Sequence, residues 1–337
     1  MNNNDFARIN KAIENINFKH DPNDLHSLEK LCDGAGEVNV YKFILNKKAF
    51  VARITPNNRS DLIQQLNNAL VASKIGYGPK IYYSDIDEGG SICIMDFLHN
   101  ENMASLTGAR YLSSLIYSMQ KMHHGDGFNN SKTLFQFLLE MDDWLNQQNI
   151  PFPTNGIHEI VIYRQNVKLL ESLWPMFKDD IRPVHHDLNP TNIIYDGTLL
   201  TIIDYDTAAQ DALYVDLCIT ANFYCTNDKA RNKLLDLYFT KNLDEEKIHK
   251  FNYIRPFAFI LHALWLASSA GIRTIPDQKI TQNYPIYSAL QLLLIKRKFD
   301  LSSQENVFIL SVQMFKEGIS LMLAQDFKEA EKFLKKS

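Results

Sequence analysis

The sequence from Val184 to Asp206 reads VHHDLNPTNIIYDGTLLTIIDYD and contains a turn between two apolar segments. The segments are residues 192–195 and 199–203, and both are rich in β-branched and aromatic side chains. Asp196-Gly197 between them is a dipeptide typical of a tight β-hairpin turn. The sequence therefore predicts a hairpin whose open end carries polar residues from both strands.

Three oxygen-bearing side chains, those of Asp187, Asn192 and Asp204, are expected to meet at this open end. Antiparallel pairing should set Asn192 against Thr201 or Ile202, so that Asp204 leaves the second strand close by. Carboxylate and amide oxygens that leave room for water and phosphate suit Mg²⁺ better than zinc or copper. The stretch therefore predicts a phosphate-handling site that uses Mg²⁺.

The composition is that of a globular protein with about two domains. The chain has 337 residues, of which 45% are hydrophobic and 22% charged, and its net charge of -4 gives no global attraction to nucleic acid or anionic lipid. No signal peptide is visible, and the longest apolar stretch, residues 257–270, is shorter than the roughly 20 residues that cross a bilayer. The four cysteines form no close pair. We therefore expect a cytoplasmic protein without a nucleic-acid partner or a membrane span, and its oligomeric state stays open.

Other enzyme classes are disfavoured by missing motifs. The sequence contains no G-x-x-x-x-G-K-[ST], G-x-S-x-G or H-E-x-x-H, the signatures of P-loop enzymes, α/β hydrolases and zinc proteases. Gly76 and Gly78 lack the third glycine of a dinucleotide fingerprint and indicate a turn.

The spacing of the polar residues resembles the catalytic loop of kinase-type phosphotransferases, in particular that of the aminoglycoside phosphotransferase and choline kinase family. The residues that carry the resemblance are His185, Asp187, Asn192, Asp204, Asp206 and the later Tyr214-Val215-Asp216-Leu217. It covers residues 25–270. It implies a two-lobed, protein-kinase-like α+β fold, with ATP and Mg²⁺ as cofactors and a small-molecule hydroxyl as acceptor.

The same resemblance implies a role for each residue of the loop. Asp187 would orient the acceptor hydroxyl and take its proton, whereas Asn192 and Asp204 would hold Mg²⁺. The resemblance also implies that Asp216 braces the loop, in addition to serving as a helix N-cap. From the residues themselves, we expect His185 to be a structural residue that bonds the backbone near the loop. We expect no role for His186, and we expect the pair at residues 123–124 only to end a helix.

The first hundred residues should supply the nucleotide-covering part. The turn containing Gly34 and Gly36 would close over the phosphates, and Arg53 on a strand would grip the α and β phosphates in a bidentate manner. The usual glutamate partner of this cation is missing, because Gln65 or Asp61 stands at the corresponding helix positions. Residues 92–98 resemble the strand and linker that meet the nucleobase.

The predicted secondary structure changes near Leu98 from mostly strands to mostly helices. We expect residues 1–97 to form a small lobe with an antiparallel sheet, and residues 98–337 to form a larger, mostly helical lobe. The strands are predicted at residues 38–45, 49–54, 81–84 and 91–95, with a helix at 61–75. Further helices are predicted at residues 106–123, 135–147, 157–177, 214–225, 247–270 and 307–334.

The acceptor is the least determined part of the prediction. Asp206 and Trp265 are our candidates for substrate contacts, with Asp211 as a further acid in the cleft, since a cleft with acids and aromatic faces suits an amine-bearing molecule. A choline- or ethanolamine-like amino alcohol is preferred, and an aminoglycoside is the alternative. A nucleotide-binding pseudoenzyme stays open because of Gln65. A protein substrate is disfavoured, because no activation loop is recognisable between Asp204 and residue 216.

Overall fold

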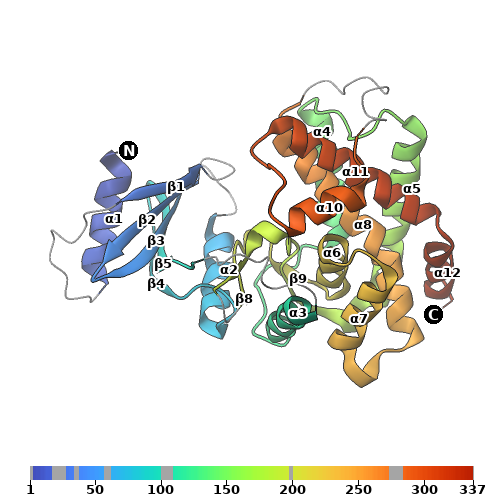
Figure 1. Ribbon diagram of the computed structural model, residues 1–337, viewed down its shortest axis with the longest axis horizontal. Coiled ribbons are helices and arrows are strands. Elements are labelled where there is room, and N and C mark those ends of the chain that lie inside the picture. The colour runs from blue at the N-terminus through green and yellow to red at the C-terminus, as the bar shows by residue number, and fades with distance from the viewer. Residues whose placement is uncertain are drawn as a thin grey trace.

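The computed structural model describes residues 3–16, 28–33, 38–56, 62–99, 109–196, 200–272 and 284–336. A strand-rich lobe and a larger helical lobe lie next to each other (Figure 1). The predicted α+β fold with an antiparallel sheet followed by helices is therefore confirmed. Gly34, Gly36 and Asp61 lie outside the described residues.

The small lobe is built on one antiparallel sheet with the strand order β1-β2-β3-β5-β4. Alternate residues of its strands face opposite sides. Phe43 and Ala52 point to a core that helix α1 covers with Ile9 and Ile13, whereas Arg53 faces the other side. The elements are α1 (Asn3–Asn15), β1 (Glu29–Asp33), β2 (Asn39–Leu45), β3 (Lys48–Thr55), β4 (Ile81–Asp87) and β5 (Gly90–Asp96).

Helix α2 (Leu62–Ile75) connects the two lobes. Its Asn68 side chain donates hydrogen bonds to the backbone carbonyls of Tyr205 and Ala208, at 3.1 and 2.8 Å. Ala72 on the same helix belongs to the core of the helical lobe. Since α2 also packs on β4 and β5, it fixes the sheet relative to the residues around Asp204.

The helical lobe surrounds α8, a helix of 26 residues that packs against α4, α6, α11 and α12. Close packing of α11 depends on Gly318, because a Cβ at this position would lie 3.0 Å from the backbone oxygen of Pro256. Helix α11 is long and apolar enough to cross a membrane, but 56% of that segment is buried in the protein. The helices are α3 (Ala109–His123), α4 (Leu134–Gln147), α5 (Ile157–Leu173), α6 (Tyr214–Tyr224), α7 (Asp228–Phe239), α8 (Glu245–Ala270), α10 (Tyr287–Ile295), α11 (Gln304–Leu323) and α12 (Gln325–Leu334).

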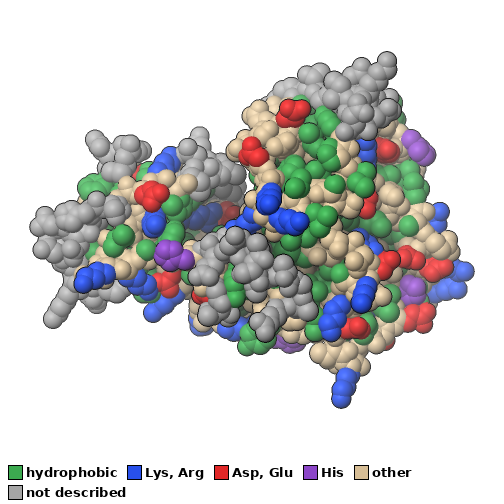
Figure 2. Space-filling view, viewed as in Figure 1, with side chains coloured by type: hydrophobic (Ala, Val, Ile, Leu, Met, Phe, Trp, Pro, Cys, Tyr) green, Lys and Arg blue, Asp and Glu red, His purple; other side chains and the backbone are tan. Residues whose placement is uncertain are grey.

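Two short strand pairs and a few helical turns complete this lobe. The pairs are β6 (Ile181–Val184) with β9 (Ala209–Ala212) and β7 (Ile193–Tyr195) with β8 (Leu200–Ile202), and the turns are η3 (Trp174–Asp180), η4 (Pro190–Asn192) and η5 (Thr240–Asn242). On the face shown in Figure 2, acidic and basic side chains are interspersed over both lobes. This agrees with the small net charge of -4.

Two expectations need correction. The hairpin pairs Ile193 with Ile202, and the N–H of Ile203 donates to the backbone oxygen of Asn192 at 2.9 Å. Asn192 therefore lies opposite Ile203, and not opposite Thr201 or Ile202 as predicted. The single helix predicted at residues 307–334 is two helices, because Ala324 is extended with ψ 157°. Asn192 still lies beside the end of β8, as the convergence of the polar residues requires.

Candidate active site

The loop from β6 to β7 presents Asp187 in a strongly constrained conformation. His186 has a left-handed φ of 66°, which turns the chain directly after β6. Asn189 caps the following turn, since its side chain accepts a hydrogen bond of 2.7 Å from the N–H of Thr191. Local backbone geometry and hydrogen bonds thus help to shape the loop.

The Asp187 carboxylate accepts three side-chain hydrogen bonds. Asn189 donates to Oδ1 at 2.7 Å, and Asn192 donates to Oδ2 at 2.7 Å. The third partner is His262 of α8, whose Nε2 lies 3.0 Å from Oδ1. Burial alone would raise the pKa of Asp187, but the hydrogen bonds and charge of His262 and the bond from Asn189 lower it below the ordinary value of 3.8. The group is therefore an ionised carboxylate at neutral pH.

Asp216, in the first turn of α6, holds this loop through hydrogen bonds of its side chain. It is fully buried, and it accepts backbone N–H bonds from His185 at 2.8 Å and His186 at 2.9 Å. His123 of α3, expected only to end its helix, lies 3.1 Å from Asp216 Oδ2 and 2.5 Å from the Tyr238 hydroxyl. Burial opposes the charge of Asp216, but the bond and charge of His123 and the loop N–H groups lower its pKa below 3.8. Its side chain braces the loop and does not cap α6.

The two histidines of the loop have separate structural contacts. His185 Nε2 donates to the Ile203 carbonyl at 2.9 Å, and its Nδ1 accepts from the N–H of Asp187 at 3.2 Å. Burial lowers the pKa of His185, which agrees with this neutral form. His186 Nε2 lies 2.8 Å from Asp211 Oδ2. Because Asp211 is fully buried and also accepts from the N–H of Leu134, it adds no carboxylate to the cleft.

Arg297, which no sequence pattern indicated, fixes the other end of the loop. It follows α10 with a left-handed φ of 50°. Its Nη2 donates to the backbone oxygens of Pro190 and Ile193, at 2.8 and 2.7 Å. The segment that carries Asn192 is thus tied to a helix more than 100 residues later in the chain.

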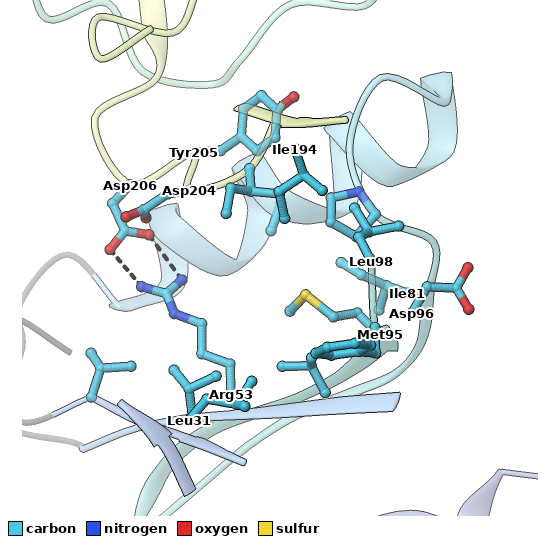
Figure 3. A pocket seen from close by; sticks show the side chains of 17 residues that line it. Leu31, Arg53, Ile81, Met95, Asp96, Leu98, Ile194, Asp204, Tyr205 and Asp206 are labelled. Carbon is cyan, nitrogen blue, oxygen red and sulfur yellow. Dashed lines mark hydrogen bonds and ion pairs between the residues drawn. The ribbon is translucent and has the colours of Figure 1, made fainter. Parts of the chain in front are cut away.

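A cavity of about 470 Å³ lies between the lobes. Its walls are mostly apolar, and its charged end is formed by Arg53, Asp204 and Asp206 (Figure 3). Side chains from the strand and linker at residues 92–98 line the opposite side. An elongated ligand with a flat apolar part and a charged part fits such a cavity. The lining residues are Leu31, Val38, Val40, Val51, Arg53, Ala69, Pro79, Ile81, Met95, Asp96, Phe97, Leu98, Ile194, Ile203, Asp204, Tyr205 and Asp206.

Arg53 reaches across the cavity to the helical lobe. Its guanidinium forms two parallel hydrogen bonds to the Asp206 carboxylate, at 2.9 and 2.6 Å. Burial disfavours the cation, but Asp206 outweighs this effect and raises the pKa of Arg53. Asp206, expected on the acceptor side, thus lies against Arg53, and Gln65 is buried near this cation.

Asp204 combines unusual backbone and charge properties. It has a left-handed φ of 63°, and more than a third of its surface is open to solvent in the cavity while protein atoms crowd its other sides. This burial and the charge of Asp206 raise its pKa to about 7. Asp187 contributes to the same effect, so both Asp206 and Asp187 are close enough to repel the Asp204 carboxylate.

A divalent cation fits this arrangement. It would relieve the repulsion around Asp204, and the oxygens of Asp204 and Asn192 are hard ligands of the kind that Mg²⁺ prefers. Within the described part of the chain, no group of three or more His, Cys, Asp or Glu side chains offers a complete metal site. Two carboxylates plus substrate phosphates are, however, the usual ligands of Mg²⁺ in phosphate-transferring proteins.

Trp265 lies beside the loop through His262. Its ring is 5.3 Å from that of His262 and 5.8 Å from that of Phe137, both in edge-to-face geometry. His262 therefore lies between the Trp265 ring and the Asp187 carboxylate and contacts both. His262 was visible in the sequence only as an interruption of the apolar stretch in residues 257–270, and nothing local linked it to the loop.

Comparisons with known proteins match the chain to one family and to several solved structures. A family model described as the phosphotransferase enzyme family matches residues 33–248. No curated protein matches the sequence. Among solved structures, a choline/ethanolamine kinase family protein from Mesorhizobium loti has a TM-score of 0.67 at 14% identity, covering 98% of this chain and 99% of that one.

Two further solved structures share the fold. A choline kinase from Streptococcus pneumoniae has a TM-score of 0.58 at 15% identity, with 88% of this chain and 98% of that chain covered. A spectinomycin phosphotransferase in complex with ADP and spectinomycin has a TM-score of 0.53 at 14% identity, with 86% and 94% covered.

Proposed function

Because the chain belongs to the phosphotransferase enzyme family, we propose that it transfers the γ-phosphoryl group of ATP to a hydroxyl of a small amine-bearing molecule. The observation that carries this proposal is the position of Asp187. Its ionised carboxylate is close enough to Asp204 to raise the pKa of that group, and Asp204 closes the charged end of the cavity. A hydroxyl acceptor beside Asp187 would therefore meet a phosphate chain bound in the cavity.

Each site residue receives a role in this proposal. Asp187 orients the acceptor hydroxyl and accepts its proton. Arg53 binds the α and β phosphates, which requires that it share or exchange its present partner, Asp206. Asn192 and Asp204 hold Mg²⁺, which neutralises phosphate charge when bound. Positioning and charge neutralisation supply most of the acceleration.

The apolar part of the cavity is proposed to hold the nucleobase. Met95 and Asp96 end β5, an inner strand of the sheet, and together with Phe97 and Leu98 they line this part of the cavity. The glycine turn of Gly34 and Gly36, outside the described residues, would close over the phosphates. A solved neighbour that is named as a complex with ADP supports nucleotide use.

We propose a choline- or ethanolamine-like amino alcohol as the acceptor. Solved neighbours named as choline or ethanolamine kinases support this class. An aminoglycoside would favour several free acids, but Asp206 is paired with Arg53 and Asp211 is buried. The partly buried ring of Trp265 near the loop suits the small cation of an amino alcohol better.

The experiment that tests the function is ADP release from Mg-ATP over a panel of acceptors. The panel contains choline, ethanolamine, spectinomycin, other aminoglycosides, thiamine and homoserine, with Asp187→Asn as the blank. Turnover with amino alcohols that is absent in the blank and in EDTA supports the proposal. Turnover with aminoglycosides alone overturns the acceptor class. Silence over the whole panel, while ATP still raises the melting temperature, favours a nucleotide-binding pseudoenzyme.

A further inference from the structure

His262 is buried in α8, but one of its ring nitrogens contacts the loop outside this helix. Only 5% of its surface is exposed, and the rings of Phe223 and Trp265 pack at 5.1 and 5.3 Å from it. Its Nδ1 lies 3.0 Å from the backbone oxygen of Ala258, one helical turn earlier. That bond alone would satisfy a buried histidine of purely structural function, but the ring also reaches Asp187.

Both hydrogen-bond partners of His262 are acceptors. A backbone carbonyl cannot donate, so Nδ1 must carry a hydrogen. An ionised carboxylate cannot donate either, so Nε2 must carry the second hydrogen. The ring is therefore an imidazolium whenever Asp187 is ionised, and the alternative would require a proton on Asp187. The amides of Asn189 and Asn192, which both donate to the same carboxylate, favour the ionised form.

The three donors divide the two oxygens of Asp187 unequally. Oδ1 accepts from His262 at 3.0 Å and from Asn189 at 2.7 Å, which uses both of its lone-pair sites. From the residues that the structure describes, Oδ2 accepts one bond, from Asn192 at 2.7 Å, which leaves one of its lone-pair sites open to a further donor. A quarter of the Asp187 side chain is exposed to solvent. Only Oδ2 can therefore receive a further donor without losing an existing bond.

We propose that His262, as an imidazolium, is the positioning residue of Asp187 and selects Oδ2 as the atom that takes the acceptor proton. This inference rests on the proposed function. In the reaction, the acceptor oxygen bonds to the γ-phosphorus and the bond from that phosphorus to the β,γ-bridging oxygen breaks. The hydroxyl proton passes to Oδ2, and ADP leaves with the bridging oxygen. His262 keeps both of its protons throughout.

The protonation of His262 can be measured without any acceptor. Two-bond ¹H–¹⁵N correlation spectra of ¹⁵N-histidine-labelled protein distinguish neutral rings from imidazolium rings, and His262→Gln assigns the signal among the 10 histidines of the chain. Because both ring nitrogens of His262 face acceptors, we expect both to carry a proton in the wild-type protein, and we expect one proton to be lost in Asp187→Asn. An unprotonated Nε2 in the wild-type protein overturns the inference.

The positioning role is tested by kinetics once an acceptor is known. His262→Leu should lower kcat about 10²-fold through misplacement of the carboxylate, with the KM for ATP unchanged because His262 lies outside the cavity. His262→Gln, which keeps a donor near Asp187 without the charge, should recover part of this loss. His158→Gln, at an exposed histidine of α5, is the control. A wild-type kcat in His262→Leu refutes the role.

The two measurements separate the inference from the proposed function. If no acceptor is phosphorylated, the proposed function fails, while the spectra still report whether the His262 imidazolium exists. If turnover is present and His262 is neutral, the function stands and the inference fails. If the His262→Leu protein does not fold, the spectra of the wild-type chain and the kinetics of His262→Gln decide the question.

Discussion

Replacing Asp216 with asparagine should destabilise the protein strongly, although the side chain keeps its size. The carboxylate accepts three hydrogen bonds, from the backbone N–H groups of His185 and His186 and from His123. An asparagine has one oxygen, so its NH₂ group must face at least one of the loop N–H groups, and neither of these can accept. At least one buried donor therefore loses its partner, and the buried charge that pairs with His123 is removed.

The expected size of this effect follows from the burial of the site. Removing one partner of a fully buried ionic network costs about 3–5 kcal/mol. An unfolding entropy of about 2.1 cal/mol/K per residue gives about 0.7 kcal/mol/K for a chain of 337 residues that unfolds as a unit. The melting temperature of Asp216→Asn should therefore fall by about 4–7 °C at pH 7.

Differential scanning calorimetry measures this change, with Asp143→Asn at an exposed position of α4 as the control. The pKa of Asp216 is lowered in the folded state, so its contribution is present above the ordinary value of 3.8 and disappears as the pH falls through the lowered folded-state pKa. The difference between wild type and Asp216→Asn should shrink over that acidic range. A melting temperature at pH 7 within about 1 °C of the control would refute the argument.

Three further results are expected. Gly318→Ala should gain about 1 kcal/mol of helix propensity but lose about 1–3 kcal/mol, because its Cβ would lie 2.6 Å from Ile260 Cγ1 and 3.0 Å from the Pro256 oxygen, so that the net loss in calorimetry is about 0–2 kcal/mol; a raised melting temperature contradicts this. Burial raises the pKa of Cys93 and Cys225 to about 12 each, so peptide mass spectrometry after iodoacetamide treatment at pH 8 should find both unmodified in the native protein and modified in urea. Ile194→Trp should fill the cavity and abolish the rise in melting temperature caused by ATP, and a retained rise would argue against a nucleotide in this cavity.

The sequence was most informative where function depends on residues that are close in the chain. The loop and the hairpin bring Asp187, Asn192 and Asp204 together through local spacing and one Asp-Gly turn, and the family resemblance based on that spacing is confirmed by the family match over residues 33–248. The alternation of the strands likewise predicted β2 and β3 to within about a residue at each end.

The contacts that hold the loop could not be predicted, because each joins distant segments without a local signal. Asp187 and His262 are 75 positions apart, and Arg297 and Pro190 are 107 apart. The pairing of Arg53 with Asp206 spans 153 positions, and the sequence suggested only that the usual glutamate was missing. Such contacts depend on the packing of α8, α10 and β3 around the loop, which periodicity does not specify.

The residues that hold the loop differ from the residues that line the cavity, so mutations can change the two sets independently. Asp216, His123 and Arg297, which hold the loop, are absent from the residues that line the cavity. Under the proposed function, a mutation at Met95 or Ile194 would alter which nucleobase is preferred without disturbing the groups that hold the Asp187 carboxylate. Preference for the phosphoryl donor would then drift under selection while the arrangement around Asp187 is inherited unchanged.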